Sequence, residues 1–134
     1  MADLEASLRT YLIAQAGIKT AFGSSNTRIY IDRIDPKITA VYPFAILRTA
    51  AEAPDYVMSG ETKDRALIQI DVYSTSKTTV NSGAYAIRTV LSGYKGTAGS
   101  VSIGSCFVNA TRGGYDPDAK IFRRSVDYAI GLNG

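Results

Sequence analysis

Two stretches in which apolar residues recur at every second position constrain the fold of this chain more than any other feature. In residues 65–73, four apolar residues share one face of an extended strand: Ala66, Ile68, Ile70 and Val72. In residues 121–132, five residues do so: Phe122, Val126, Tyr128, Ile130 and Leu132. Arg124 interrupts that second face near its open end. Such alternation is typical of strands that bury one face and leave the other free.

Two segments carry the four-residue spacing of amphipathic helices that can cover the buried face. The first has apolar positions at Leu4, Leu8, Leu12 and Ala16, and we expect Asp3 to cap it and Gly17 to end it. A short helical turn is expected over residues 19–22. The second begins after the capping residues Ser74-Thr75-Ser76 and ends at Gly93, with Gly83 weakening it. Its apolar stripe is Val80, Ala84, Ile87 and Leu91.

The remaining segments predict further strands and two loops. Residues 28–31 form a short strand, and residues 44–49 form another that opens after Pro43. Residues 50–64 are polar and are expected to be a long connection. Apolar parity switches near Gly104-Ser105, which indicates a bulge in a strand running to about Ala110. Residues 112–119 contain Gly113-Gly114 and Asp116-Pro117-Asp118, which predict a turn.

These elements predict an α+β fold in one domain over residues 1–134. It is a largely antiparallel sheet of about five strands with two helices packed on one face. The other face mixes polar and apolar residues: Arg65, Leu67, Gln69, Asp71, Tyr73, Ile121, Arg123, Ser125 and Asp127. Such a face suits a partner or a wet lumen, and an ordinary solvated face is the alternative.

Charge is distributed unevenly along the chain, although the net charge is only +3. Residues 72–115 contain no acidic residue, and their basic residues are Lys77, Arg88, Lys95 and Arg112. Residues 52–64 are acidic, with Glu52, Asp55, Glu61 and Asp64 against Lys63 alone. Chance charges on solvated loops would give the same pattern, and +3 is too mild to diagnose nucleic-acid binding.

The residue types needed for common enzyme chemistry are missing. The chain has no histidine and one cysteine, so Ser-His or Cys-His nucleophiles and ordinary zinc sites are excluded. Cys106 lies in an apolar strand pattern and is expected to be a buried packing thiol, typical of a reducing compartment. Asp116 and Asp118 are interpreted as a turn, and Asp32 and Asp35 as a solvated loop. We predict no catalytic residue, no cofactor and no metal.

The sequence shows no sign of a signal peptide or of a membrane-spanning segment. The N-terminus has no basic segment followed by an apolar one, so no signal peptide is expected. No apolar stretch reaches the roughly 18 residues of a membrane span, so no membrane partner is expected.

The order of several short phrases resembles the tail-completion, or tail-terminator, proteins of long-tailed bacteriophages over nearly the whole chain. The phrases are residues 27–30 (TRIY), 42–47 (YPFAIL), 66–74 (ALIQIDVYS), 86–88 (AIR), 91–97 (LSGYKGT), 115–116 (YD) and 122–128 (FRRSVDY). None is a catalytic signature, and the likeness lies in their order and spacing.

The resemblance implies a structural virion protein that is not an enzyme. Such proteins form a ring, usually of six subunits, on the head-proximal end of the tail tube, at the tail–head junction. The ring ends tube polymerisation and joins the tail to the head. The implied partners are further copies of the chain, the tail-tube protein, a head-completion or connector protein, and genomic DNA passing through the lumen without sequence recognition. Assembly is expected in the host cytoplasm.

A ring needs one patch on each subunit to meet a different patch on its neighbour. The charge distribution suggests such a pair of patches as a hypothesis. The acidic patch holds Glu52, Asp55, Glu61 and Asp64, with Arg65 beside it, and the basic patch holds Lys120, Arg123 and Arg124. Complementary charge would set the register of the contact more than its affinity.

Three other functions remain open at this stage. A head-closure or head–tail joining protein of the neck would bind the portal side instead of the tube. A nucleic-acid-binding module would show DNA affinity that falls steeply with salt. An enzyme would have to work with carboxylates, lysines and tyrosines alone.

Overall fold

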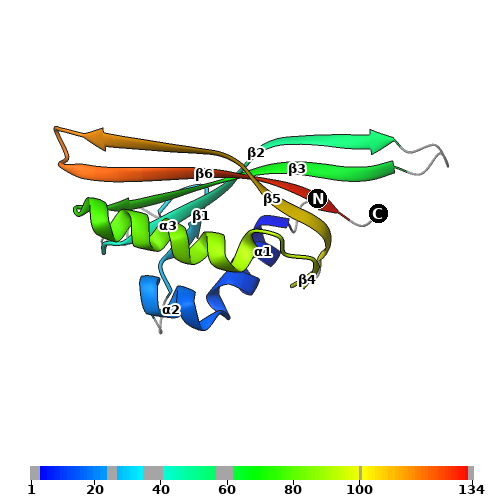
Figure 1. The fold of residues 1–134 in the computed structure, drawn as a ribbon, viewed down its shortest axis with the longest axis horizontal. Helices are drawn as coiled ribbons and strands as arrows, with labels where there is room; N and C mark the ends of the chain where they lie inside the picture. The colour runs from blue at the N-terminus through cyan, green and yellow to red at the C-terminus, as the bar shows by residue number, and fades with distance from the viewer. Residues whose placement is uncertain (1–3, 24–26, 35–40, 57–61, 100, 133–134) are drawn as a thin grey trace.

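The computed structural model describes residues 4–23, 27–34, 41–56, 62–99 and 101–132, and it gives the backbone alone for residues 51–56 and 62–64. Its strands are β1 (Ile29–Ile31), β2 (Phe44–Tyr56), β3 (Thr62–Ser74), β4 (Gly96–Ala98), β5 (Val101–Asp116) and β6 (Ile121–Leu132). They form one sheet in the order β1-β2-β3-β6-β5-β4 (Figure 1). β1 runs parallel to β2, and the other neighbours are antiparallel. The sheet is therefore two long hairpins, β2–β3 and β5–β6, joined side by side.

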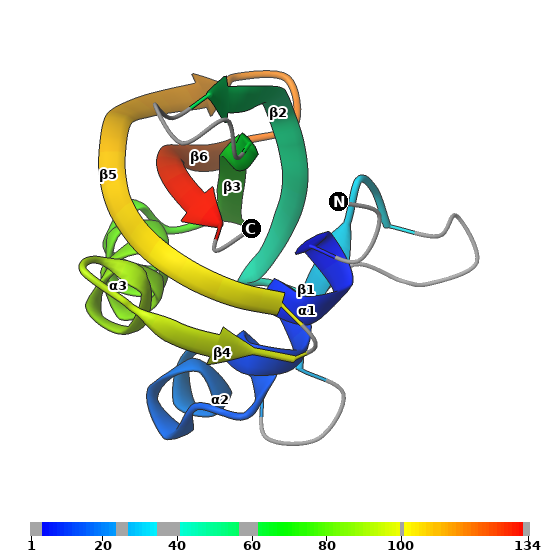
Figure 2. The same ribbon diagram turned by 90° about the vertical axis from the view of Figure 1, so that its right-hand side faces the viewer.

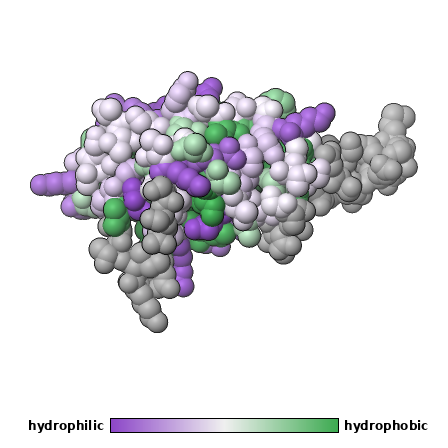
Figure 3. Space-filling view, turned by 90° about the horizontal axis from the view of Figure 1, so that it is seen from below, coloured by the Kyte–Doolittle hydropathy of each residue, from purple (hydrophilic) through white to green (hydrophobic). Residues whose placement is uncertain are grey.

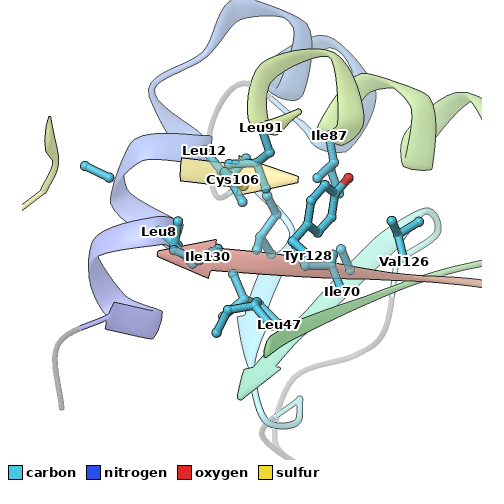
Figure 4. Packing of buried hydrophobic residues seen from close by; sticks show 14 of the residues in the cluster. Leu8, Leu12, Leu47, Ile70, Ile87, Leu91, Cys106, Val126, Tyr128 and Ile130 are labelled. Carbon is cyan, nitrogen blue, oxygen red and sulfur yellow. The ribbon is translucent and has the colours of Figure 1, made fainter. Parts of the chain in front are cut away.

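Three helices lie on one side of this sheet: α1 (Leu4–Ile13), α2 (Ala16–Phe22) and α3 (Lys77–Leu91) (Figures 1 and 2). The sheet is curled, with β2 and β5 bending around the central pair β3 and β6 (Figure 2). Buried side chains from the helices and from β3, β5 and β6 meet between the layers (Figure 4). Seen from the helix side, the surface shows hydrophobic residues only as scattered patches (Figure 3).

The predicted fold class is right in outline and differs in its numbers. The sheet has six strands, one of them parallel to its neighbour, and three helices cover it. The first predicted helix is broken, because α1 ends at Ile13 and α2 begins at Ala16. Gly17, expected to end the helix, lies inside α2, and Asp3, expected to cap it, lies outside the described residues. The short turn expected at residues 19–22 is the end of α2.

The predicted connection over residues 50–64 is wrong. β2 continues to Tyr56 and β3 begins at Thr62, with Glu52 opposite Ala66 and Asp55 opposite Lys63. The turn predicted from Gly113-Gly114 is also strand, since β5 runs to Asp116. Main-chain hydrogen bonds hold an antiparallel ladder whatever the side chains are, so polar or glycine-rich sequence does not mark its end. Residues 96–98 form the short strand β4.

Several local predictions are confirmed. Ser76 caps α3 by accepting a hydrogen bond from the Thr79 amide, 3.4 Å away. Gly93 follows α3 with a φ of 76°, a left-handed conformation that glycine adopts without strain. The bulge predicted at Gly104-Ser105 is present between Ile103 and Ser105. A second bulge, between Val108 and Ala110, was not predicted, and it moves Ala110 to the face away from the helices.

The turn predicted at Asp116-Pro117-Asp118 is confirmed at residues 117–120. The Asp116 carboxylate accepts hydrogen bonds from the amides of Asp118 and Ala119, at 3.0 and 3.3 Å. This arrangement stabilises a tight connection between β5 and β6. Within the described residues, no helix is long and apolar enough to cross a membrane.

Gly83 lets α3 approach the rest of the core closely. A Cβ atom at this position would lie 3.0 Å from Phe22 Cζ and 3.1 Å from Val72 Cγ1. Both neighbours are fully buried, so they have little room to move. The glycine that weakens the helix in isolation is therefore explained by packing.

We expect Gly83→Ala to lower the free energy of unfolding by about 1 kcal/mol, because crowding in a packed core costs more than the gain in helix propensity. Urea denaturation of the purified protein measures this. Ser82→Ala, at the exposed neighbouring position of the same helix, is the matched control and should raise stability slightly. An equal rise in both variants would contradict the close approach.

Tyr128 is fully buried beside Ile87 and Cys106 (Figure 4). Its hydroxyl has no hydrogen-bond partner in the described part of the chain. Burial raises the pKa of this phenol, so the side chain stays neutral. An unpaired buried hydroxyl costs stability without giving a bond in return.

Tyr128→Phe should therefore raise the free energy of unfolding by about 1 kcal/mol. Tyr11→Phe is the control, because the Tyr11 hydroxyl donates to the Val90 carbonyl at 3.3 Å. That variant should lose a few tenths of a kcal/mol or more. Loss of stability in Tyr128→Phe, measured by urea denaturation, would mean that the hydroxyl is satisfied after all.

Candidate assembly interface

The predicted acidic patch lies on the β2–β3 hairpin. Glu52 and Asp55 belong to β2, Asp64 and Arg65 belong to β3, and Glu61 lies outside the described residues. Arg65 is exposed and pairs with Gly131 of β6. The hairpin extends beyond the helices at one end of the sheet (Figure 1), and its acidic sequence is therefore carried away from the body of the molecule.

The predicted basic residues share the β5–β6 hairpin, but they do not form one surface. Lys120 is exposed in the turn. Arg123 and Arg124 are consecutive on β6, so their side chains point to opposite faces. Arg123 lies beside Gly114 and Tyr73 on the face away from the helices, whereas Arg124 lies on the helix side near Arg88.

The two hairpins project from opposite ends of the sheet (Figure 1). The acidic and basic patches of one copy are therefore separated along the strands.

The face away from the helices holds two buried carboxylates under exposed arginines. Asp71 Oδ2 lies 2.8 Å from Arg48 Nη2, and Asp71 Oδ1 accepts from Gln69 Nε2 at 2.9 Å. Asp127 receives both terminal nitrogens of Arg112, at 2.9 and 3.0 Å. The Asp71 and Asp127 side chains are 1% and 9% exposed, against 43% and 50% for Arg48 and Arg112.

This arrangement gives each of the two buried carboxylates a cation as its partner. Gln69 is opposite Asp127 and Asp71 is opposite Ser125 across β3 and β6, so the two carboxylates are diagonal neighbours. Two adjacent buried anions repel one another unless each has a cation. The hydrogen bonds from Arg112 to Asp127 raise the pKa of the guanidinium, and Arg112 thus remains charged over this buried acid.

An aromatic cluster adjoins this polar face at the end of β3. The Phe44 and Tyr73 rings are stacked with centroids 5.1 Å apart, and Tyr42 and Tyr30 lie 5.4 and 6.2 Å from Phe44. Burial raises the pKa of Tyr73, with a smaller contribution from Asp71. Beside Tyr73 is a hollow of about 340 Å³, lined by Tyr73, Gly114, Tyr115, Asp116, Ile121 and Arg123.

A second hollow, of about 170 Å³, lies between α3 and the β5–β6 hairpin. Its lining residues are Asn81, Ala84, Tyr85, Arg88, Thr111, Arg124 and Val126. Tyr85 is 71% exposed. Two arginines and an exposed tyrosine give this side of the hairpin a positive, partly aromatic surface.

The structure also places the residues considered above for metal binding and nucleophilic chemistry. In the part of the chain that it describes, no three His, Cys, Asp or Glu side chains group to hold a metal ion. Cys106 is buried, as predicted, and burial raises the pKa of its thiol to about 11, so it is a poor nucleophile at neutral pH. Asp32 has a left-handed φ of 65° and its amide donates to Leu47 O; Asp35 lies outside the described residues.

Sequence reasoning missed the two ion pairs. It placed Asp71 and Asp127 on the correct face, but it did not pair them with Arg48, in the correctly predicted strand over residues 44–49, or with Arg112, which it assigned to a turn. The signal was present, because opposite charges occur on the same face of neighbouring strands. Using it required the strand order and the bulge between Val108 and Ala110, which together bring Arg112 to Asp127.

The described residues form a curled sheet with helices on one side, two arginine–aspartate pairs on its polar face, and two long hairpins. The family model of the tail completion protein gp17 matches residues 6–132. The chain therefore belongs to the tail completion gp17 family, and it is a structural tail-completion protein of the bacteriophage virion.

Comparison with solved structures supports the fold. A chain in a structure described as the virion of a native gene transfer agent particle superposes with a TM-score of 0.75. The match covers 98% of this chain and 95% of that chain at 16% sequence identity, so it shows a shared fold. No curated protein sequence gives a significant match.

Arg48→Met should lower the free energy of unfolding by about 1–3 kcal/mol, because it leaves the buried Asp71 without its cation. Adding Asp71→Leu to that variant should recover much of the loss, since the buried charge is then removed. Urea denaturation of both single variants and the double variant gives the coupling energy. Strictly additive losses would show that the pair contributes nothing.

Proposed function

We propose that this protein forms a closed ring, of about six copies in line with the family resemblance, on the head-proximal end of the tail tube. The ring ends tube polymerisation and provides the surface to which the head docks. Genomic DNA passes through the lumen without sequence recognition. The observation that carries the proposal is the tail-completion family match over residues 6–132.

The geometry supports a ring because each copy carries two unlike hairpins at opposite ends of its sheet. The acidic β2–β3 hairpin and the β5–β6 hairpin, which carries Lys120, Arg123 and Arg124, project from opposite ends of the sheet (Figure 1). Contacts between unlike surfaces close into rings when the rotation between copies allows it. In this arrangement the acidic hairpin of one copy meets the basic hairpin of the next.

The polar face is suited to a lumen through which a polyanion passes. Arg48 and Arg112 expose positive charge, but each is tied to a buried carboxylate beneath it. A guanidinium neutralised in this way attracts phosphates less than a free one does. DNA would then pass without being held.

The test is assembly in the presence of purified tail-tube protein. We expect rings at the end of tubes of limited length in electron micrographs, and tubes without a length limit when the protein is left out. Binding to the portal side alone, with no effect on tubes, would instead support a head-closure role in the neck.

Reversing Glu61 and Asp64 to Lys should reduce the yield of rings on tubes about tenfold or more, because like charges then meet across the contact. Reversing Lys120 and Arg123 to Glu in a second protein and mixing the two should restore mixed rings. Lys77→Glu, at an exposed position at the start of α3, is the matched control and should assemble normally. Full assembly of the first variant alone would exclude the charge pairing.

A further inference from the structure

The two outermost long strands run well beyond the short strands beside them. β4 pairs with β5 only over residues 101–103, and β1 pairs with β2 only over residues 45–47. One further main-chain group on each outer edge is hydrogen-bonded. On β5 the Cys106 carbonyl accepts from the Gly93 amide at 2.7 Å, and on β2 the Thr49 amide donates to the Glu5 carboxylate at 3.2 Å. Beyond them, no described strand pairs with the outer edge of β5 or β2.

The outward groups of β5 follow from the alternation of an antiparallel ladder. Because the Cys106 carbonyl bonds to Gly93, this residue points its main-chain groups away from β6, and so does Val108. The bulge between Val108 and Ala110 shifts the pattern by one residue. After it, Thr111, Gly113 and Tyr115 point their N–H and C=O groups to the open edge.

This edge lacks most devices by which sheet proteins avoid pairing with other chains. Those devices include proline, short length, charged side chains and β-bulges, and of these the edge carries the bulge between Val108 and Ala110. Residues 107–115 contain no proline and a single charged residue, Arg112, whose guanidinium is bound to Asp127. Phe107 and Tyr115 are 60% and 51% exposed, which places apolar area on both sides of the open strand.

We propose that the open edge of β5 pairs with the open edge of β2 from a second copy, so that main-chain hydrogen bonds join neighbouring sheets. This inference rests on the ring proposed above and says how its subunits are connected. The pairing of β5 with β2 of the next copy is called the joint below. β2 and β5 lie on opposite sides of the four long strands β2-β3-β6-β5, which alternate in direction. Because their number is even, β2 of the next copy runs antiparallel to β5 without any change of orientation.

The charge distribution and the offset between the two hairpins both favour β2 of a second copy as the strand that pairs with β5. The β2–β3 segment over residues 52–64 is acidic, whereas no acidic residue occurs from residue 72 to residue 115. The two hairpins project in opposite directions along the strands (Figure 1), so successive copies are offset. A closed sheet requires an offset of this kind, because its strands must tilt against the ring axis.

The position of Pro54 agrees with the same alternation on β2. The Thr49 amide points outward to Glu5, and the bulge between Thr49 and Ala51 shifts the pattern by one. Glu52, Pro54 and Tyr56 then point outward. A proline there removes no hydrogen bond to β3, and its carbonyl still accepts from a neighbouring strand.

Hydrogen exchange of the assembled ring tests the joint at the level of single amides. The free protein and the ring formed on tail-tube protein are compared by mass spectrometry with residue-level fragmentation. We expect the outward amides of Val108, Thr111, Gly113 and Tyr115 to exchange about 100-fold more slowly in the ring. The outward β2 amides of Glu52 and Tyr56 should slow as well, because they form the other side of the joint.

Two variants at one position provide an independent arm. Gly113→Pro removes an outward N–H group, and Gly113→Ala keeps it; a Cβ atom there comes no closer than 3.6 Å to Arg124 Nη1. We expect the alanine variant to form rings and the proline variant to lose at least about nine-tenths of its rings, with both monomers folded. If the proline variant fails to fold, the exchange pattern of the alanine ring decides.

Each outcome separates the joint from the ring itself. Rings with neither strand protected would overturn the joint and leave the ring function standing. Protection of β5 without β2 would assign the edge to a strand of the tube protein, or to β5 of another copy in a dimer, and would overturn the occupant proposed here. If the protein forms no ring on tubes, the proposed function itself fails.

Discussion

The ladder between β3 and β6 is the interaction on which the rest of this structure depends. It runs from Arg65 opposite Gly131 to Ser74 opposite Phe122 and joins two hairpins that otherwise belong to different halves of the chain. On one side of the ladder, Ile68, Ile70, Val126 and Tyr128 form the floor on which the helices pack. On the other side, it brings Asp71 and Asp127 together. A one-residue slip would exchange these two sides, burying carboxylates under the helices.

That constraint explains why the polar face carries arginines at Arg48 and Arg112. The register that places apolar residues toward the helices also fixes two acids next to one another on the opposite face. Their side chains are nearly inaccessible to water, and a buried anion without a partner is costly. Each flanking strand therefore supplies one cation, and the bulge in β5 between Val108 and Ala110 puts Arg112 in reach of Asp127.

The sequence predicted those elements in which side-chain pattern and backbone structure are coupled. Alternation in β3 and β6, the stripe of α3 and its Ser76 cap were read correctly, because burial of one face requires that pattern. The outer half of β2 was read as a loop, since an outer strand is held by main-chain bonds to β3 and needs no apolar period. The break between α1 and α2 was missed, because Leu12, Ala16 and the later residues still follow a helical spacing. The ion pairs depended on strand order, which local pattern does not contain.

A joint between main chains would also tolerate changes of side chain. The gene transfer agent chain is 16% identical to this protein, yet the shared fold covers 98% of this chain and 95% of that one. Contacts made by particular side chains would have to be replaced together on both surfaces of a ring as sequences diverge. N–H and C=O groups along a strand edge are the same in every sequence except at proline. The edge-to-edge joint proposed here would therefore need only the strand order and the twist to be maintained, and the charged hairpins would select the partner and the offset.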